Sequence, residues 1–442
     1  MDLPPEVFTA LSRLESAGYE AYVVGGCVRD ALMGTTPDDY DICTSATPSE
    51  VEVVFSDCRV IKTGIQHGTV TVVTEHFHLE ITVFRTDSAY SDGRHPDSVS
   101  FSRSLEEDLS RRDFTINAMA YSPDRGLVDL YCGRKDLENR IIRCVGSPDV
   151  RFYEDSLRIL RALRFGSVLD FDIEPRTADA AVYLAPRLSV ISKERVAVEL
   201  KKMITGNGFP SMLLNYPAIF AEILPELSGC IGYDQHNPHH EFDLLTHLAK
   251  TVSFLPKDPV LRLAGLLHDI GKPLTQSVDE NGIYHYFGHA AMSEKMAYNA
   301  LKRLKLSNRE IERITALIHY HDGVIEETKR AVKRRIHQLG AESFLDLLSL
   351  QRADHAAQTS NPLQRKEHTD LLFQIAREAM SESECMEANQ LAVNGHDMRS
   401  LGLEGRKIGE MLKDLLMAVI DGEVENQRDS LLVFAKQRMK SK

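Results

Sequence analysis

The hydrophobic pattern of this chain changes its period once, near residue 151, and this change limits the folds that the chain can adopt. Before that point, short runs of strand-like residues are separated by turn residues, as in AYVVGG, HGTVTVVTE, FHLEITVFR and LVDLY. After it, apolar residues recur with a period of about 3.6, as in SLRILRALRFGSV. The pattern predicts an α+β fold, with an antiparallel or mixed N-terminal sheet and its helices followed by an all-helical remainder. One short hairpin around Asn281-Gly282 is the only strand pair expected after residue 151.

The length of the chain predicts several domains. At about 100–200 residues per domain, 442 residues make about two to four. The polar stretch LSGCIGYDQHNPHHEF is the main expected linker, and a weaker break is expected near Ser360 to Pro362. We therefore expect a head at 1–150, a helical neck and body at 151–230, a third domain at 231–360 and a helical tail at 361–442.

The net charge limits how the chain can bind a polyanion. There are 52 Lys and Arg against 65 Asp and Glu, and the formal net charge is −13. This balance argues against a protein that coats nucleic acid by bulk positive charge, so a polyanionic partner must be met by a local basic patch.

Cysteine usage and the N-terminus indicate the compartment. The seven cysteines are scattered and form no C-x-x-C pair, which argues against a zinc or redox motif and favours a reducing compartment. The first residues lack the basic and apolar regions of a signal peptide, and no apolar run approaches the ~20 residues of a membrane span. We expect a soluble cytoplasmic protein with no membrane partner.

Two carboxylates in YVVGGCVRDALMGTTPDDYDICTSATP are the first candidate catalytic residues. Asp39 and Asp41 are spaced to share one face of a strand, and a pair of like charges is stable there when it holds a hard cation such as Mg²⁺. Gly25 and Gly26, one helix upstream, leave backbone N–H groups open to a phosphate. Glu80 could supply a third carboxylate. The alternatives are a solvated turn for the Asp pair, and an ion pair with an arginine such as Arg85 for Glu80.

Four motifs together carry a resemblance to a known family. GGCVRD, DDYDICTSATP, RRDFTINAMAY and EDSLRILRALRF resemble the class II tRNA nucleotidyltransferases and the similar bacterial poly(A) polymerases. The resemblance implies that Asp39 and Asp41 hold catalytic Mg²⁺, with Glu80 as the third candidate carboxylate. It implies nucleotide-binding roles for a further set, namely Gly25, Gly26, Arg29, Asp30, Arg111, Arg112, Asp113, Asn117, Asp155, Arg158 and Arg161. Asp92, Gly93 and Arg94 match the mobile loop of these enzymes, or form a surface turn.

The EDSLR motif suggests how a base is selected. On one helix, Asp155 and Arg158 would be i and i+3 and share a face. A carboxylate accepts from the amino group of cytosine or adenine while a guanidinium donates to the adjacent ring nitrogen, whereas uracil and guanine place a carbonyl oxygen opposite the carboxylate. The alternative is an ordinary intrahelical ion pair. Together with the resemblance to the tRNA nucleotidyltransferases, the pair of Asp155 and Arg158 implies CTP and ATP as substrates.

The implied activity is template-independent addition of CCA to the 3′ end of tRNA, with release of pyrophosphate. Poly(A) polymerase and specialised CC- or A-adding enzymes share the motifs and remain alternatives. Several basic residues after position 134 could contact the tRNA, but the sequence does not single them out.

A second set of residues suggests a metal site in the helical part. Imidazoles and carboxylates from several helices can enclose a transition metal or Mg²⁺. Four candidate ligands match the positions that define an HD-type phosphohydrolase domain, expected here at 231–360: His247, His268, Asp269 and Asp354. His289 and either His319 or His321 would complete a second metal position. Such domains imply hydrolysis of phosphates at RNA 3′ ends. A chain whose main activity is this hydrolysis, with an RNA-binding head, is a further alternative. Lys272 could contact a phosphate or cap its helix.

The C-terminal tail resembles the segment that reaches tRNA or a dimer partner in many bacterial CCA-adding enzymes. The alternative is that its helices only pack within the protein. A homodimer is left open. The densest basic run, KRAVKRRIHQ at 329–338, is either an RNA contact or a solvated helix face.

Overall fold

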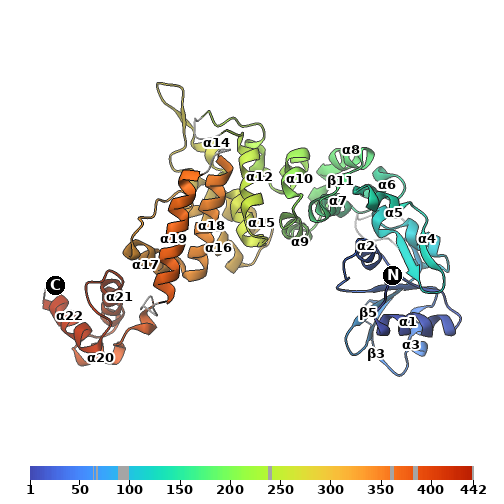
Figure 1. The fold of residues 1–442 in the computed structure, drawn as a ribbon, viewed down its shortest axis with the longest axis horizontal. Helices are drawn as coiled ribbons and strands as arrows, with labels where there is room; N and C mark the ends of the chain where they lie inside the picture. Colours follow the sequence, from blue (N-terminus) through green and yellow to red (C-terminus); the bar gives the residue numbers. More distant parts are fainter. Residues whose placement is uncertain are drawn as a thin grey trace. The chain divides into compact units, whose positions relative to one another are not determined.

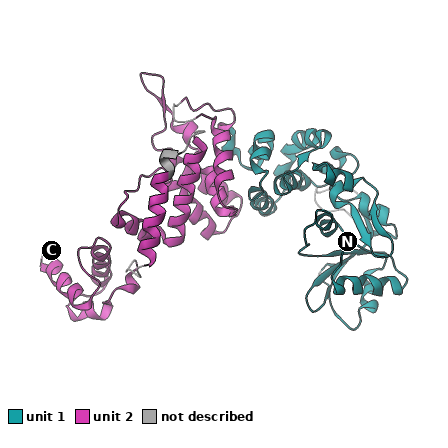
Figure 2. Ribbon diagram, viewed as in Figure 1, with its two compact units in different colours: residues 1–228 teal, residues 229–442 magenta. Residues whose placement is uncertain are grey.

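The chain folds into two compact units in the computed structural model, which describes residues 1–62, 64–65, 68–87, 99–236, 241–358, 363–381 and 387–440. Unit 1 comprises residues 1–228 and unit 2 comprises residues 229–442 (Figure 2). The division falls within the short helix η4 (Pro225–Cys230), next to the expected boundary at 230. The finer boundaries at 150 and 360 remain predictions, and residue 360 lies outside the described residues.

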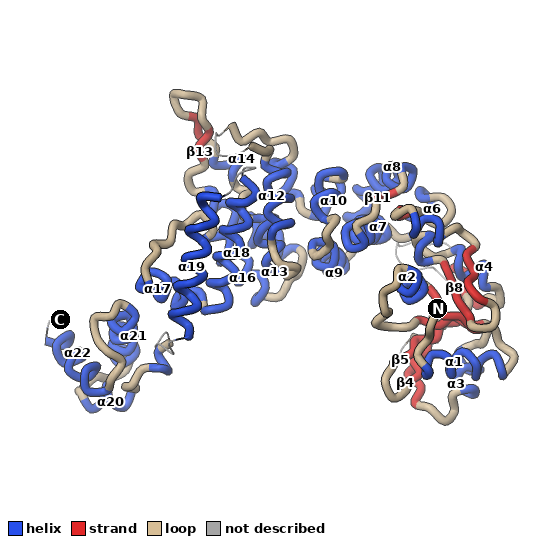
Figure 3. Tube along the Cα trace, in the orientation of Figure 1, coloured by secondary structure: helices blue, strands red, loops and turns tan. Residues whose placement is uncertain are grey.

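A seven-stranded mixed sheet forms the centre of the head (Figure 3). Its order is β3-β4-β5-β2-β1-β8-β9, and the strands are β1 (Ala21–Val24), β2 (Asp41–Thr44), β3 (Arg59–Ile61), β4 (Thr69–Val73), β5 (His78–Val83), β8 (Met119–Ser122) and β9 (Gly126–Asp129). Every neighbouring pair is antiparallel except β2 and β5, which run parallel. The alternating pattern of the sequence therefore did predict the sheet. A separate hairpin pairs β6 (Arg85–Asp87) with β7 (Val99–Phe101); the expected loop residues Asp92, Gly93 and Arg94 lie outside the described residues.

Helices cover this sheet and continue into the neck (Figure 1). Those of unit 1 are α1 (Pro5–Ser16), α2 (Gly26–Leu32), α3 (Pro48–Val54), α4 (Leu105–Ser110), η2 (Thr115–Asn117), α5 (Gly133–Glu138), α6 (Pro148–Glu154), α7 (Leu157–Leu169), α8 (Pro175–Leu184), η3 (Ala185–Val190), α9 (Lys193–Ile204), α10 (Phe209–Asn215) and α11 (Pro217–Ile223). In α1 the inward face consists of Val7, Ala10, Leu11 and Leu14, which recur at helical spacing and are buried.

The neck differs from the expected all-helical pattern in one place. β10 (Ile141–Ile142) pairs in parallel with β11 (Asp172–Ile173), which lies after residue 151. Two residues per strand are too short for alternation to be visible in the sequence, so the period of 3.6 on either side hid this pair.

Unit 2 is a helical body with a short hairpin. Its elements are α12 (Leu244–Phe254), α13 (Pro259–Leu267), α14 (Lys272–Thr275), β12 (Ser277–Val278), β13 (Tyr284–His285), α15 (His289–Arg303), α16 (Asn308–Tyr320), α17 (Lys329–Leu339), α18 (Ala341–Gln358), α19 (Leu363–Ser381), η5 (Ala388–Gln390), α20 (Gly395–Ser400), α21 (Arg406–Ile420) and α22 (Arg428–Lys440). The β12–β13 hairpin turns at Asn281-Gly282 and confirms that expectation. Among the described residues no helix is long and apolar enough to cross a membrane.

The tail packs on itself and on α17. Its buried residues, including Met398, Leu415 and Leu431, form a hydrophobic cluster of their own. Arg330 and Arg334 of the basic run both donate through Nε to Oδ1 of Asp421, at 3.0 and 2.6 Å. Part of the densest basic run therefore joins α17 to the end of α21.

Candidate active site and candidate metal centre

Three carboxylates gather at one end of the parallel strand pair in the head. Asp41 is the first residue of β2, and its register partner on β5 is Glu80. The two side chains therefore extend from neighbouring positions on one face of the sheet. Asp39 was expected on the same strand, but β2 begins only at Asp41, and Asp39 lies in the preceding loop. All three side chains are solvent-exposed.

The electrostatics of Asp41 favour a bound cation. The pKa of Asp41 is raised to about 6. The largest cause is desolvation of the carboxylate by the surrounding protein, followed by the negative charges of Glu80 and Asp39, whereas Arg112 opposes the shift. Mutual repulsion of this kind is relieved by a hard cation with oxygen ligands, so the donor set fits Mg²⁺. The three carboxylates are not as closely gathered as the ligand groups of unit 2 described below.

Gly25 brings a basic side chain close to the backbone beside these carboxylates. It links β1 to α2 with φ +81°, in the left-handed region, and a Cβ there would lie 3.0 Å from Nη1 of Arg112. A Cβ on Gly26 would lie 3.7 Å from Nη2 of Arg29. Only glycine at position 25 combines this backbone turn with the approach of Arg112.

Arg111 and Arg112 are held by a residue that the sequence reasoning missed. The carboxylate of Asp108 is fully buried, and Arg111 donates to its Oδ1 at 3.0 and 2.6 Å while Arg112 donates to its Oδ2 at 3.3 Å. Asp108 precedes the arginines by three and four residues in LEEDLSRRD, and this spacing was the signal that could have identified it.

A chain of hydrogen bonds joins α2 to α7 through the RRDFTIN motif. Nη1 of Arg29 donates to Oδ1 of Asn117 at 2.7 Å, and Nδ2 of Asn117 donates to Oδ1 of Asp113 at 3.2 Å. Arg161 donates to Oδ2 of Asp113 at 2.8 and 2.5 Å. Burial by itself raises the pKa of Asp113, but Arg161 and Asn117 outweigh it and lower the pKa to about 2. Asp30 lies at the outer end of this chain, where it accepts from Arg29 at 2.9 Å.

The EDSLR motif is not a continuous helix, contrary to the sequence-based expectation. Asp155 lies in a break between α6 and α7, where its Oδ1 accepts from the backbone N–H of Leu157 at 3.0 Å and its Oδ2 lies 3.3 Å from Nη2 of Arg195. Arg158 is buried in the first turn of α7 and pairs with Glu154 at 2.7 Å. Short polar residues such as Asp compete for backbone N–H groups and end helices, which is why the break falls at Asp155.

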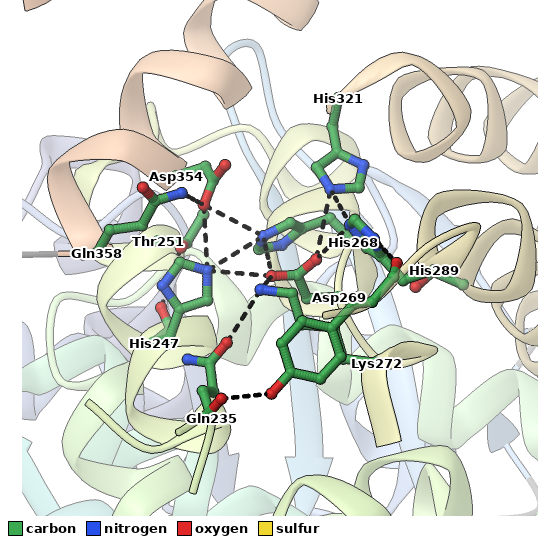
Figure 4. Close-up of polar contacts among 12 residues, drawn as sticks. Gln235, His247, Thr251, His268, Asp269, Lys272, His289, His321, Asp354 and Gln358 are labelled. Carbon is green, nitrogen blue, oxygen red and sulfur yellow. Dashed lines mark hydrogen bonds and ion pairs between the residues drawn. The ribbon is translucent and has the colours of Figure 1, made fainter. Parts of the chain in front are cut away.

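The helices of unit 2 bring six of the seven predicted metal ligands together (Figure 4). One group contains His247, His268, Asp269 and Asp354, and a second contains Asp269, His289 and His321, with the ligand atoms of each group within 4.8 Å of one another. Asp269 belongs to both groups through its two oxygens: Oδ2 lies 3.2 Å from Nε2 of His268, and Oδ1 lies 3.2 Å from Nε2 of His289. All six residues are buried.

His319 is the exception. Its side chain is 45% exposed, and its Nδ1 lies 2.7 Å from Oε2 of Glu294. Of the two residues that the sequence left open for the second position, His321 lies there instead. α16 ends at Tyr320, so His319 lies in its last turn and His321 directly follows the helix.

Backbone carbonyls orient three of the rings. The Nδ1 atoms of His268, His289 and His321 lie 2.8, 2.7 and 2.7 Å from the carbonyl oxygens of Gly265, Tyr286 and Ile318. A carbonyl oxygen only accepts, so each Nδ1 carries a proton and each Nε2, which faces the cluster, takes either a second proton or a metal ion.

The cluster strongly favours positive charge. Burial by itself lowers the pKa of His268, but Asp269 and Asp354 outweigh it and raise the pKa to about 10. The pKa values of both carboxylates lie well below their usual range. Oδ1 of Asp269 is buried and faces Nε2 of His289 at 3.2 Å and Nε2 of His321 at 3.4 Å, atoms that can donate to it only when they are protonated. This set of imidazoles and carboxylates fits a divalent metal.

Lys272 is turned into the cluster and does not cap a helix end. It begins α14, and its Nζ lies 2.7 Å from Oδ2 of Asp269 and 3.0 Å from Oε1 of Gln235, two buried partners. Gln235 is a second residue that the sequence reasoning missed; it lies in the expected linker, where no periodicity marks it.

Three family models match stretches of the chain. Residues 21–143 match the poly A polymerase head domain, residues 170–230 match the "Probable RNA and SrmB- binding site of polymerase A", and residues 279–435 match tRNA nucleotidyltransferase domain 2.

Curated relatives match along the whole chain. It is 34% identical to the CCA-adding enzyme of Leuconostoc mesenteroides, with 98% of this chain and 97% of the relative covered. It is 33% identical to that of Enterococcus faecalis, with 98% and 96% covered.

Two solved structures share the fold. The Bacillus stearothermophilus CCA-adding enzyme in complex with CTP has a TM-score of 0.76 and 30% identity, with 99% of each chain covered. The Thermotoga maritima CCA-adding enzyme complexed with tRNA has a TM-score of 0.60 at 18% identity, with 99% of this chain and 96% of that one covered. The full-length identities show that the chain belongs to the CCA-adding enzyme family, the tRNA nucleotidyltransferases that add CCA without a nucleic-acid template.

Proposed function

We propose that this chain extends the 3′ end of tRNA with C, C and A, using CTP and ATP, at the carboxylates of the head. The observation that carries the proposal is the pairing of Asp41 with Glu80 across β2 and β5, with Asp39 beside them and the arginines of RRDFTIN nearby. The relative crystallised with CTP supports the nucleotide substrate, and the full-length relatives named CCA-adding enzymes support addition to tRNA. The cytoplasm is the proposed compartment.

The head residues have distinct roles in this reaction. The 3′-hydroxyl of the RNA attacks the α-phosphorus of the nucleotide, a new P–O bond forms, and the bond to pyrophosphate breaks. Asp39, Asp41 and Glu80 would hold Mg²⁺, which activates the hydroxyl and neutralises the triphosphate when bound. Arg111 and Arg112, oriented by Asp108, supply fixed positive charge for the phosphates.

Asp155 and Arg158 are the proposed base-reading pair. The Leu157 N–H and Arg195 hold the two oxygens of Asp155, and Glu154 holds Arg158. A carboxylate oxygen accepts more than one hydrogen bond, so Asp155 can also accept from the amino group of cytosine or adenine. Uracil and guanine would place an acceptor against this carboxylate and leave it unpaired.

The experiment supplies three tRNAs, ending before C74, before C75 and before A76, with labelled CTP or ATP separately and an oligo(A) primer in parallel. We expect addition of C, C and A and then arrest. Incorporation of A alone, or an unlimited A tail on the primer, contradicts the proposal and favours an A-adding enzyme or a poly(A) polymerase.

A matched pair of variants tests the metal carboxylates. Asp39→Ala should reduce incorporation by about a hundredfold or more, because it removes charge that stabilises the transition state. Asp38→Ala removes the neighbouring exposed carboxylate and should leave the rate unchanged. Equal rates for the two variants would mean that the metal site lies elsewhere.

We also propose that the cluster of unit 2 is the metal centre of an HD-type phosphohydrolase acting on phosphates at RNA 3′ ends. Its support is a buried cluster in which Asp269 joins two groups of candidate ligands, with three imidazoles oriented by backbone carbonyls and two carboxylates of low pKa. The cluster borders a hollow of about 280 Å³. A 2′,3′-cyclic phosphate would be opened there by water, whose oxygen joins phosphorus while a ribose oxygen leaves with a proton.

Metal content and hydrolysis test this second activity together. His268→Ala and Asp269→Ala should lose both bound metal and hydrolysis of RNA 2′,3′-cyclic phosphate. His319→Ala replaces the histidine that the structure places outside the cluster and should retain both. An unchanged hydrolysis rate in His268→Ala contradicts the proposal.

A further inference from the structure

Two aromatic side chains form a shelf at the hollow beside the metal cluster. His285, the last residue of β13, and Phe287, two residues on, stack with ring planes 9° apart and centroids 5.6 Å apart. Both line the hollow that also contains Asp269, His289 and Asp354. We call this pair the 285/287 shelf.

Phe287 is unusually open for a residue in such a position. It is 80% exposed, although the aromatic residue before it, Tyr286, is turned inward: the Tyr286 hydroxyl donates to the backbone carbonyl of Gln235 at 2.7 Å. A single exposed apolar residue is ordinary on a protein surface. An exposed ring that lines a hollow next to a metal cluster, with a second ring stacked on it, is not explained by packing.

Hydrogen bonds link the segment that carries the shelf to the cluster. The carbonyl oxygen of Tyr286 accepts from Nδ1 of His289, a ligand in the second metal group, at 2.7 Å. Behind the shelf, Nε2 of His285 lies 3.1 Å from Oδ2 of Asp279, whose Oδ1 accepts from the N–H groups of Asn281 and Ile283 in the hairpin turn, both at 2.9 Å. The hairpin therefore holds the His285 ring, on which Phe287 stacks, and the backbone at Tyr286 holds His289.

The hollow continues past the cluster. A second lobe of about 450 Å³ shares His321, Asp322, Asp354 and Gln358 with the first and extends to His355 and His368. The hollow at the cluster thus includes an aromatic surface, and the adjoining lobe adds space for the rest of a ligand.

We propose that the 285/287 shelf stacks the terminal nucleobase of an RNA 3′ end whose phosphate lies at the metal cluster. The placement of the phosphate at the cluster depends on the proposed phosphohydrolase activity. The stacking of a base depends only on the geometry of the 285/287 shelf. Every base has a π-face, so stacking accepts any terminal nucleotide and suits an enzyme that meets 3′ ends of differing sequence. The ligand class is a nucleoside 2′- or 3′-phosphate, cyclic or open, at the end of a chain or free.

Photo-crosslinking detects the stacking without requiring hydrolysis. An oligoribonucleotide ending in 5-iodouridine 3′-phosphate is irradiated with the full chain in Mn²⁺ buffer, and crosslinked peptides are mapped by mass spectrometry. We expect a crosslink at Phe287, much weaker with a 3′-hydroxyl end and absent in Phe287→Ala. Phe254→Ala removes another exposed phenylalanine of unit 2 that does not line the hollow, and it should retain the crosslink. No crosslink in this segment, or equal yield from both RNA ends, overturns the proposal.

Kinetics separate the shelf from the activity on which it rests. Phe287→Ala should raise KM for adenosine 2′,3′-cyclic phosphate about tenfold while kcat is kept, since stacking binds the base and not the phosphate. KM for glycerol 1,2-cyclic phosphate, which has no base, should not change, and Phe287→Tyr should restore the wild-type value. Equal changes in KM for both substrates overturn the proposal that the shelf stacks a base.

If the wild type hydrolyses neither substrate, the phosphohydrolase proposal fails, and the crosslink still decides whether the shelf stacks a base. Adenosine 3′-monophosphate added as a competitor should lower the crosslink yield if the shelf binds a free nucleotide, and should leave the yield unchanged if the shelf requires the end of an RNA chain.

Discussion

At the residue scale, Asp113 shows how one buried carboxylate orders several nucleotide-binding candidates. It accepts from Arg161 through Oδ2 and from Asn117 through Oδ1, and Asn117 in turn accepts from Arg29. Removing Asp113 would therefore disturb side chains on α2, η2 and α7 at once, because a buried guanidinium without its partner is costly.

The lowered pKa of Asp113 predicts a pH-dependent stability. A pKa of about 2, against an ordinary 3.8, means that its ionised form stabilises the fold by about 2 kcal/mol above pH 4, and that this contribution is lost as pH falls towards 2. Asp113→Asn should lower the free energy of unfolding of unit 1 by about this amount at pH 7, and the difference from wild type should shrink between pH 4 and pH 2. Urea unfolding followed by hydrogen exchange of unit 1 peptides measures it. A difference that stays constant to pH 2 would mean that another group titrates.

At the element scale, the single parallel pairing in the head sheet builds the proposed magnesium site. Antiparallel neighbours surround β2 and β5, yet these two strands run parallel and place Asp41 and Glu80 at matched positions. Shifting the register by one residue would turn Glu80 to the other face of the sheet.

Glu80→Gln tests this pairing. It keeps the size of the side chain but removes a negative charge beside Asp41, so we expect the Mg²⁺ concentration for half-maximal CTP incorporation to rise about tenfold or more. Glu75→Gln changes an exposed carboxylate in the turn before β5 and should behave as wild type. The same Mg²⁺ requirement in both variants would limit the metal site to Asp39 and Asp41.

At the scale of the whole molecule, the two proposed chemistries lie in separate compact units, at 1–228 and 229–442. Substitutions at sites that belong to separate units and share no partners act nearly independently. The net charge of −13 is likewise a sum over unlike parts, since several of its carboxylates are candidate metal ligands.

This separation predicts that each activity can be removed alone. Asp39→Ala should reduce nucleotide addition by about a hundredfold or more and leave cyclic-phosphate hydrolysis within about twofold of wild type, and His268→Ala should do the reverse. Both activities are measured on the same preparations, with circular dichroism confirming the fold. Loss of both activities in either variant would mean that the units are coupled.

The sequence by itself predicted the sheet, the helical remainder, the family and the residues of both candidate sites. These features depend on periodicity and on short motifs, which are local properties of the chain. The closeness of Asp39 and Asp41 in the chain and the ordered His and Asp residues of unit 2 were visible for the same reason, although the expected strand begins only at Asp41.

Only the tertiary structure decided which residues meet. The register of β5 against β2 brought Glu80 to Asp41, the end of α16 selected His321 over His319, and the break before α7 took Asp155 out of the helix. Asp108, Gln235 and the 285/287 shelf acquire their roles through partners that periodicity does not identify. Such contacts depend on packing between segments far apart in the chain, where a single residue's shift in register or helix end moves a side chain to another face.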